Sequence, residues 1–351
     1  MGNRQALLSL IRSVLDNSFQ VKLPKSIDWT SVLELATEHG VQGICLEAIE
    51  RLPVGTIPQQ ILLQWIGLSE MQRQQFGQTW RVACKLDKLW ATEGIHATVL
   101  KGRSIAKYYN EPFHRYSCDL DVFIGEEWRR ACVLLEDQGI RLEHEVYKEV
   151  EFTLDGIYVE CHRYITPIRG NKHLKQFELY LRSLLDNDPK AYFEGTTLVC
   201  PSLMFTVMLY VEHSLGDFLH GHITLKHIVD WVVLRRQPVD RNAFNAKCKE
   251  FKFNKFLSLI DTLADVLEGK MEYNELQPSY RKEFDEIFKT PVANSPSSWF
   301  ERRVKLFFNI LQNGKKYQKY GYTSMSSFLF NSVWAHFLDR SGDSLIRSVT
   351  I

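Results

Sequence analysis

The chain has 351 residues, of which 45% are hydrophobic and 24% charged, as in ordinary soluble globular proteins. This length is sufficient for two or three domains with cores of their own. The formal net charge is +1, so no overall field favours nucleic acid or an anionic membrane as a partner. No apolar run reaches the length of a membrane span, and we therefore expect no membrane association.

The cysteines and the N-terminal segment bear on the cellular compartment. Seven cysteines are scattered singly, without a CxxC pair or a His/Cys cluster of the kind that binds zinc. An odd number of cysteines without a framework is typical of a reducing compartment. The first residues are too often polar to form a signal peptide. We expect a cytoplasmic protein.

Apolar residues recur at helical spacing through the first ninety or so residues, and Asp28 is placed to cap one of these segments. This spacing predicts an N-terminal helical region over residues 1–93. Its helices are expected over residues 5–15, 29–51 and 58–92.

After Gly94 the apolar period changes from about 3.6 to about 2, which is the period of strands. Asp155-Gly156 lies between two alternating segments and is a strong hairpin signal. We expect an α+β core with a small mixed sheet over residues 94–170. Its elements are a strand at 96–100, a helix at 103–109, a strand at 118–124, a helix at 126–138 and hairpin arms at 141–154 and 157–164.

From about residue 172 the helical spacing returns, and it predicts a C-terminal helical region over residues 171–351. Segment 203–234 is strongly apolar, and Pro201-Ser202 is suited to begin a helix there. Residues 291–298 have the composition of a linker or surface loop. Further helices are expected over 241–269, 275–289, 297–312 and 324–339.

Two acids, Asp119 and Asp121, lie two residues apart in the predicted strand 118–124. Strand alternation places both carboxylates on one face and sends Leu120 and Val122 to the other face, toward a core. Neighbouring carboxylates repel each other unless a cation or protons neutralise them. Hard oxygen ligands suit Mg²⁺, so the pair indicates a divalent metal site.

A third acid is expected if this site holds two metal ions for phosphoryl or nucleotidyl transfer. Glu160 is the first candidate, because Val159 and Cys161 alternate to the opposite face and adjacent strands lie about 4.8 Å apart. Glu151, on the first hairpin arm, is the alternative. His162 shares the face of Glu160 and could contact a phosphate or one of the acids.

These motifs resemble the uncharacterised nucleotidyltransferase family of the polymerase-β-like superfamily. The resemblance covers roughly residues 25–240 and includes helical segments at 29–41 and 213–230. It implies an α+β fold in which a small mixed-sheet nucleotidyltransferase core is flanked by N-terminal and C-terminal helical regions. The matching residues are Leu100-Lys101-Gly102, Arg115, Asp119-Leu120-Asp121-Val122 and Val159-Glu160-Cys161-His162.

The resemblance implies a Mg²⁺-dependent enzyme that moves a nucleoside monophosphate from a nucleoside triphosphate to a hydroxyl acceptor. Asp119 and Asp121 would bind two Mg²⁺ ions, for which Mn²⁺ could substitute, with Glu160 as third ligand. The acceptor could be a small molecule, a sugar or a protein side chain, and nucleic acid is not expected. The residues implied to contact or position the triphosphate are Lys101, Gly102, Arg103, Ser104 and Arg115.

The sequence is compatible with three functions. The first is nucleotidyl transfer, which the presence of all three acids favours. The second is a catalytically silent nucleotide-binding or interaction protein on the same fold. It is favoured by Lys-Gly-Arg-Ser at 101–104, in place of the superfamily's Gly-Ser loop, and by Cys118, where glycine is usual. The third is a glycosyltransferase, which would need a larger sheet before its Asp-x-Asp motif than this chain has.

Structural roles are the alternative for several of these residues. Lys101 and Arg103 could be solvated charges, and Arg115 could form a salt bridge with Asp119. Histidines 213, 220, 222 and 227 lack the spacing of zinc ligands. We expect those at 213 and 227 to face the cleft or join a polar network. Lys226 and Asp230 share one helical face and could close the pocket or pair with each other.

Overall fold

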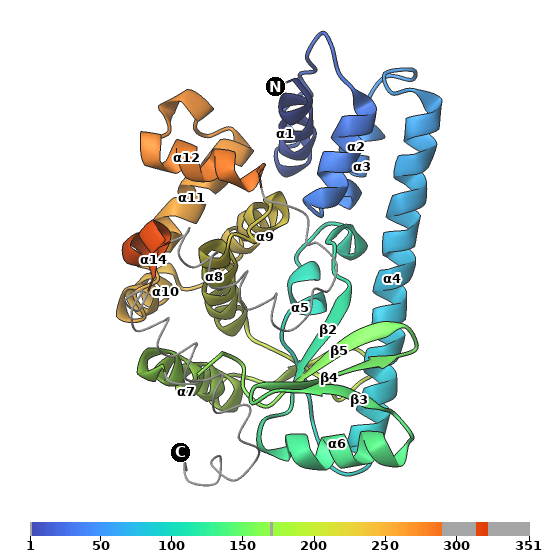
Figure 1. Cartoon of the computed structure of the whole chain (residues 1–351), viewed down its shortest axis with the longest axis vertical. Coiled ribbons are helices and arrows are strands. Elements are labelled where there is room, and N and C mark those ends of the chain that lie inside the picture. The colour runs from blue at the N-terminus through green and yellow to red at the C-terminus, as the bar shows by residue number, and fades with distance from the viewer. Residues whose placement is uncertain (1, 169–170, 290–313, 322–351) are drawn as a thin grey trace.

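The computed structural model describes residues 2–168, 171–289 and 314–321. They form an α+β fold in which a mixed sheet is flanked along the chain by N-terminal and C-terminal helices, as predicted (Figure 1). The helices predicted over 297–312 and 324–339, and the linker at 291–298, lie outside the described residues. None of the helices in the described part is long and apolar enough to cross a membrane. All seven cysteines are free thiols.

The N-terminal helices are packed beside one end of a long helix that runs down to the sheet (Figure 1). The packed helices are α1 (Gly2–Leu15), α2 (Trp29–Glu38) and α3 (Gln42–Ile49), and the long helix is α4 (Gln59–Ala91). Asp28 caps α2 by accepting a hydrogen bond from the amide of Thr30. The single helix predicted over 29–51 is instead two, because the backbone at Gly40 has a φ of 65° and cannot continue a right-handed helix. The 33 residues of α4 extend about 50 Å.

Seven strands form one sheet in the order β3-β4-β5-β2-β1-β7-β6. Its centre is the parallel pair β2 and β5, and the β4–β5 hairpin turns at Asp155-Gly156 with φ values of 49° and 78°. The strands are β1 (Thr98–Val99), β2 (Asp119–Phe123), β3 (Leu142–Glu145), β4 (Glu149–Leu154), β5 (Ile157–His162), β6 (Ala191–Tyr192) and β7 (Val199–Cys200).

The sheet differs from the prediction at both edges. The predicted arm 141–154 is two strands, β3 and β4, which pair antiparallel with each other. At the other edge, β7 pairs parallel with β1 and antiparallel with β6, so the sheet continues beyond residue 170. Strands of two residues are too short to produce a recognisable alternating pattern, and the sequence therefore suggested only helix in that region.

The two faces of the sheet have opposite character. Leu120 and Val122 of β2, with Val159 and Cys161 of β5, enter a core formed with the end of α4 and with α6 (Trp128–Asp137). The acids at positions 119, 121 and 160 alternate to the other face. Strand alternation therefore separates the apolar core from the candidate site, as the sequence predicted.

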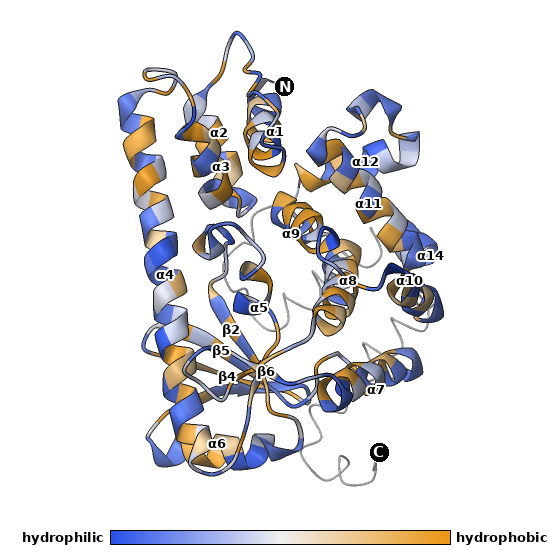
Figure 2. Cartoon of the chain, turned by 180° about the vertical axis from the view of Figure 1, so that it is seen from behind, coloured by the Kyte–Doolittle hydropathy of each residue, from blue (hydrophilic) through white to orange (hydrophobic). Residues whose placement is uncertain are grey.

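The C-terminal helices surround α8, and Figure 2 shows that α9 and much of α8 consist of hydrophobic residues. Segment 203–234 divides into two helices at Gly221, which has a φ of 78° and caps α8. The helices are α7 (Lys172–Asn187), α8 (Leu203–His220), α9 (Leu225–Arg235), α10 (Arg241–Glu250), α11 (Asn254–Glu268), α12 (Pro278–Ile287) and α14 (Gly314–Tyr320).

The packing of α3 against the loop before β2 generates a stability prediction. A Cβ added to Gly43 would lie 2.9 Å from both the Cα and the carbonyl oxygen of His114, which are backbone atoms. Gly43→Ala should therefore lower the free energy of unfolding by about 1–3 kcal/mol in urea denaturation. Gly67→Ala is the matched control, because a Cβ there meets nothing within 4 Å. It should raise stability by about 0.5–1 kcal/mol. Equal stability of the two variants would contradict the described packing.

Candidate active site

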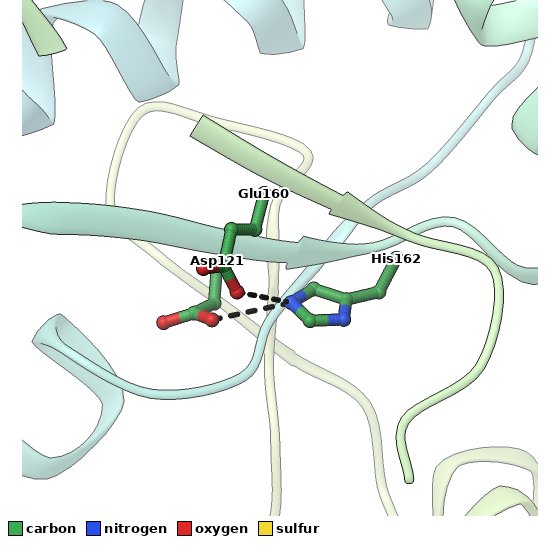
Figure 3. A group of neighbouring side chains, drawn as sticks. All are labelled: Asp121, Glu160 and His162. Carbon is green, nitrogen blue, oxygen red and sulfur yellow. Dashed lines mark hydrogen bonds and ion pairs between the residues drawn. The ribbon is translucent and has the colours of Figure 1, made fainter. Parts of the chain in front are cut away.

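The site is centred on the parallel register of β2 and β5. This register places Asp121 directly opposite Glu160, and both side chains lie on the polar face of the sheet (Figure 3). Asp121 is almost completely buried, whereas the side chain of Glu160 is about one-fifth exposed. The structure therefore brings together two of the three predicted acids.

One ring nitrogen of His162 points toward both carboxylates (Figure 3). Its Nε2 is 3.1 Å from Oδ1 of Asp121 and 3.4 Å from Oε2 of Glu160, and its Nδ1 is 2.8 Å from Oε2 of Glu149. Burial lowers the pKa of His162, but its contacts with the three carboxylates outweigh burial and raise the pKa to about 9. The ring is therefore a cation at neutral pH. The sequence predicted that His162 could contact a phosphate or one of the acids, and the structure shows contacts with acids.

The surroundings of the acids shift their pKa values in different directions. Burial acts to raise the pKa of Asp121, but Lys101 and His162 hold it well below its ordinary value. The pKa of Glu149 is about 2, because its contacts with His162 and Lys148 outweigh burial. Burial raises the pKa of Glu160, and the neighbouring charge of Asp121 adds to this effect. Asp121 and Glu149 are therefore both anions at neutral pH.

A divalent ion fits part of this arrangement. Asp121, Glu160 and His162 each offer a ligand atom, and these atoms lie within 4.8 Å of one another. Carboxylate oxygens suit Mg²⁺ and Mn²⁺, whereas an imidazole binds a metal only after losing its proton. Asp119 is not in this group; its Oδ1 lies 3.3 Å from the hydroxyl of Ser117. Metal binding by Asp119, Asp121 and Glu160 stays a prediction.

The loop after β1 brings a lysine to the acids. Nζ of Lys101 lies 2.8 Å from Oδ1 of Asp121. Burial lowers the pKa of Lys101, but the charges of Asp121, Glu160 and Asp119 more than reverse this effect, so its pKa is raised. Gly102 follows with a φ of 56°, and a Cβ there would lie 3.2 Å from the hydroxyl of Ser117. This backbone conformation favours glycine.

The next two residues of the loop have different surroundings. The guanidinium of Arg103 lies 4.1 Å from the ring centre of Phe76 and 4.4 Å from that of Trp80, both on α4. Burial lowers the pKa of Arg103 to about 10. Ser104 is fully buried at the start of α5 (Arg103–Ala106), and its hydroxyl donates to the carbonyl of Val99. Ser104 therefore stabilises the turn between β1 and α5.

Arg115 joins the loop to the C-terminal helices. Its Nε and one terminal nitrogen donate to the two carboxylate oxygens of Asp230 at 2.8 and 2.9 Å, and the other terminal nitrogen lies 3.3 Å from the carbonyl of Gly102. Tyr109 also donates to Asp230. The salt-bridge partner of Arg115 is thus Asp230, rather than Asp119 as the structural alternative proposed. Asp230 consequently does not need Lys226 as a partner.

Two cavities meet at Lys101, Gly102, Asp119 and Asp121. The first lies against α4 and is lined by Phe76, Thr79, Trp80 and Arg103 among others. The second has a volume of about 220 Å³, is open to solvent and lies between the core and helices α8 and α9. Its lining from these helices includes His213, Asp217, Lys226, His227 and Asp230.

Glu149 and Asp217 contact residues of the site but were not predicted from the sequence. Glu149 could have been found from the hairpin, whose register places it opposite His162. Asp217 follows His213 by one helical turn and contacts it, a spacing visible in the sequence. His213 and His227 face the cavity and also join a polar network, which are the two positions expected for them. Cys118 is exposed and is not among the residues that line either cavity.

The electrostatics of His162 generate a second prediction. Its pKa should be close to 9 in the metal-free protein, measured from the pH dependence of its imidazole NMR signals. The resulting stabilisation is fully present below the unfolded-state value of about 6.5 and is lost as pH rises through 9. Glu149→Gln should lower this pKa, whereas Glu151→Gln, at the next position on the same strand face, should leave it unchanged. A wild-type value near 6.5 would contradict the arrangement.

Comparison with known proteins gives one match. A family model described as "Uncharacterised nucleotidyltransferase" matches residues 25–268, which is well over half of the chain. Neither curated proteins nor solved structures gave a match. The matched region runs from just before α2 to the end of α11 and includes the acids, the Lys101-Gly102 loop and both cavities. It supports nucleotidyl transfer as the general reaction, and the chain belongs to this uncharacterised nucleotidyltransferase family.

Proposed function

We propose that the protein is a divalent-metal-dependent nucleotidyltransferase that moves a nucleoside monophosphate from a nucleoside triphosphate to a hydroxyl acceptor. The observation that carries this proposal is the register that places Asp121 opposite Glu160, beside the Lys101-Gly102 loop. Membership of the family supports the general reaction. The metal, the nucleotide and the acceptor are proposals of ours.

Asp119, Asp121 and Glu160 are the proposed ligands of two Mg²⁺ or Mn²⁺ ions. When bound, such ions lower the pKa of an acceptor hydroxyl and neutralise charge on the leaving pyrophosphate. His162 contacts two of these acids through Nε2 and keeps its proton at neutral pH. We assign it the role of orienting Asp121 and Glu160, since partners behind the ligands commonly fix their geometry.

Lys101, Gly102 and Arg103 are the proposed triphosphate-binding residues. The ammonium of Lys101 can donate to phosphate oxygens in place of Asp121, and charge-assisted hydrogen bonds of this kind are strong. Gly102 lets the backbone come close to a phosphate. Arg103 lies on the aromatic wall of the first cavity, where its guanidinium is held by Phe76 and Trp80. Ser104 and Arg115 support this loop through the contacts described above.

A catalytically silent nucleotide-binding protein is the second candidate, and one observation favours it. Lys101 and His162 already contact Asp121 as cations, so the acid cluster is compensated without a metal ion. In such a protein these contacts would persist when nucleotide binds. Binding and transfer must therefore be tested separately.

Binding is tested by isothermal calorimetry with Mg²⁺ and each of the common nucleoside triphosphates. Asp119→Asn combined with Asp121→Asn should weaken Mg²⁺-dependent binding at least tenfold, because two of the proposed ligand charges are removed. Glu151→Gln is the matched control, since it removes a carboxylate from the same sheet face outside the proposed ligand set. Circular dichroism should show intact folds. Unchanged affinity in the double variant would refute the metal site.

Transfer is tested by pyrophosphate release from the same triphosphates in the presence of hydroxyl-bearing acceptors. Wild-type protein should release pyrophosphate only when Mg²⁺ or Mn²⁺ is present, and a chelator should stop the release. Glu160→Gln should reduce the rate by a factor of about 100 or more, as expected for loss of a ligand to a catalytic metal ion. A protein that binds nucleotide with the metal but never releases pyrophosphate would support the silent alternative.

A further inference from the structure

Polar contacts continue from the acid cluster into the second cavity. Nζ of Lys101 lies 3.0 Å from Nε2 of His213, and Nδ1 of His213 lies 3.1 Å from Oδ2 of Asp217. Nε2 of His227 lies 3.0 Å from the same oxygen of Asp217. The contacts thus form one chain from Asp121 on the sheet to α8 and α9.

The partners of His213 determine which ring nitrogen carries the proton. Lys101 is an ammonium group that also lies 2.8 Å from the carboxylate of Asp121, and an ammonium can only donate. Nε2 of His213 must therefore present a lone pair to Lys101. The proton of the neutral ring is then on Nδ1, where Asp217 accepts it. This is the tautomer in which a histidine can take a proton at Nε2.

Asp217 is itself held in place from the other side. The amide of Thr224 donates to Nδ1 of His227 at 3.0 Å, so the proton of a neutral His227 is on Nε2 and points at Asp217. Burial acts to raise the pKa of Asp217, but the two histidines lower it well below its usual range. Asp217 is therefore an ionised carboxylate that is fixed relative to His213.

His213 is also accessible from the cavity. The side chain of His213 is 37% exposed although α8 is otherwise a largely buried, apolar helix (Figure 2). His213 lines the same cavity as Lys101, Asp119 and Asp121. A molecule in this cavity would reach both Nε2 of His213 and the proposed metal-binding acids.

We propose that His213 is the general base for the acceptor hydroxyl and that Asp217 is its positioning residue. This inference rests on the proposed function. Once Lys101 turns to the triphosphate, Nε2 of His213 takes the proton of the acceptor O–H. The acceptor oxygen forms a bond to the α-phosphorus, and the bond between that phosphorus and the pyrophosphate oxygen breaks. Pyrophosphate leaves with the electron pair, and Asp217 stabilises the imidazolium.

The same geometry assigns the second cavity to the acceptor. A volume of about 220 Å³ is below the range of about 300–1,000 Å³ typical of sites for drug-sized ligands, so the cavity suits a smaller molecule. The acceptor class that fits is a small hydroxylated molecule. Glycerol and water are suitable probes, because both can present a hydroxyl in this cavity.

The test incubates the protein with Mg²⁺ or Mn²⁺ and each common nucleoside triphosphate, with and without glycerol. The products measured are pyrophosphate, nucleoside monophosphate and the glycerol adduct. His213→Ala should lower kcat about 100-fold or more, with the KM for the triphosphate nearly unchanged. Added imidazole should restore part of the rate, because the deleted side chain leaves an accessible space. His222→Ala is the matched control; it removes an exposed imidazole just beyond the end of α8 and should retain the wild-type rate.

Failure of the proposed function and failure of the base assignment give different results in this test. If wild-type protein releases no pyrophosphate with any triphosphate, the proposed function itself fails. If wild-type protein is active and His213→Ala keeps its kcat within twofold, or loses it without rescue by imidazole, the base assignment is wrong.

Nitrogen NMR of the metal-free protein adds a test that needs no activity. Nδ1 of His213 should carry the proton, and Asp217→Asn should shift the ring toward the other tautomer. A ring protonated only at Nε2 would overturn the proposal.

Discussion

The parallel pairing of β2 with β5 is the constraint on which the site depends. Because facing residues in this register are fixed, Asp121 and Glu160 must share a small volume on one face of the sheet. Carboxylates in this position require compensating charge, which Lys101 and His162 provide from the loop after β1 and the end of β5. The opposite face of the same strands is a closed apolar core, so the register cannot slip by one residue without burying the acids.

The C-terminal helices complete the site as well as covering it. Arg115 and Asp230 form a buried ion pair that ties the loop before β2 to α9. Such a pair recovers its desolvation cost only with good geometry and further hydrogen bonds, which Tyr109 and the carbonyl of Gly102 supply here. Lys101 makes a second connection through His213. The Lys101-Gly102 loop is therefore positioned by helices more than one hundred residues away in the chain.

Much of this arrangement was predictable from local sequence, and the rest was not. Alternation predicted that Asp119 and Asp121 share a face, and Asp155-Gly156 predicted the hairpin, because both signals depend on neighbouring residues alone. The partner of Arg115 depends on tertiary packing, so the sequence offered Asp119 where the structure has Asp230. The short strands β6 and β7 owe their conformation to pairing with β1 and with each other, which leaves no local signature.

The proposed function requires that the carboxylates around Asp121 bind a divalent ion together with a nucleotide. The most direct test is a crystal structure of the protein with Mn²⁺ and a non-hydrolysable nucleoside triphosphate, with the ion located by its anomalous scattering. We predict an anomalous peak in contact with Asp121 and Glu160, with Nζ of Lys101 moved from Asp121 to a phosphate oxygen. Bound nucleotide without an anomalous peak, and with the contact between Lys101 and Asp121 intact, would contradict metal binding by these carboxylates.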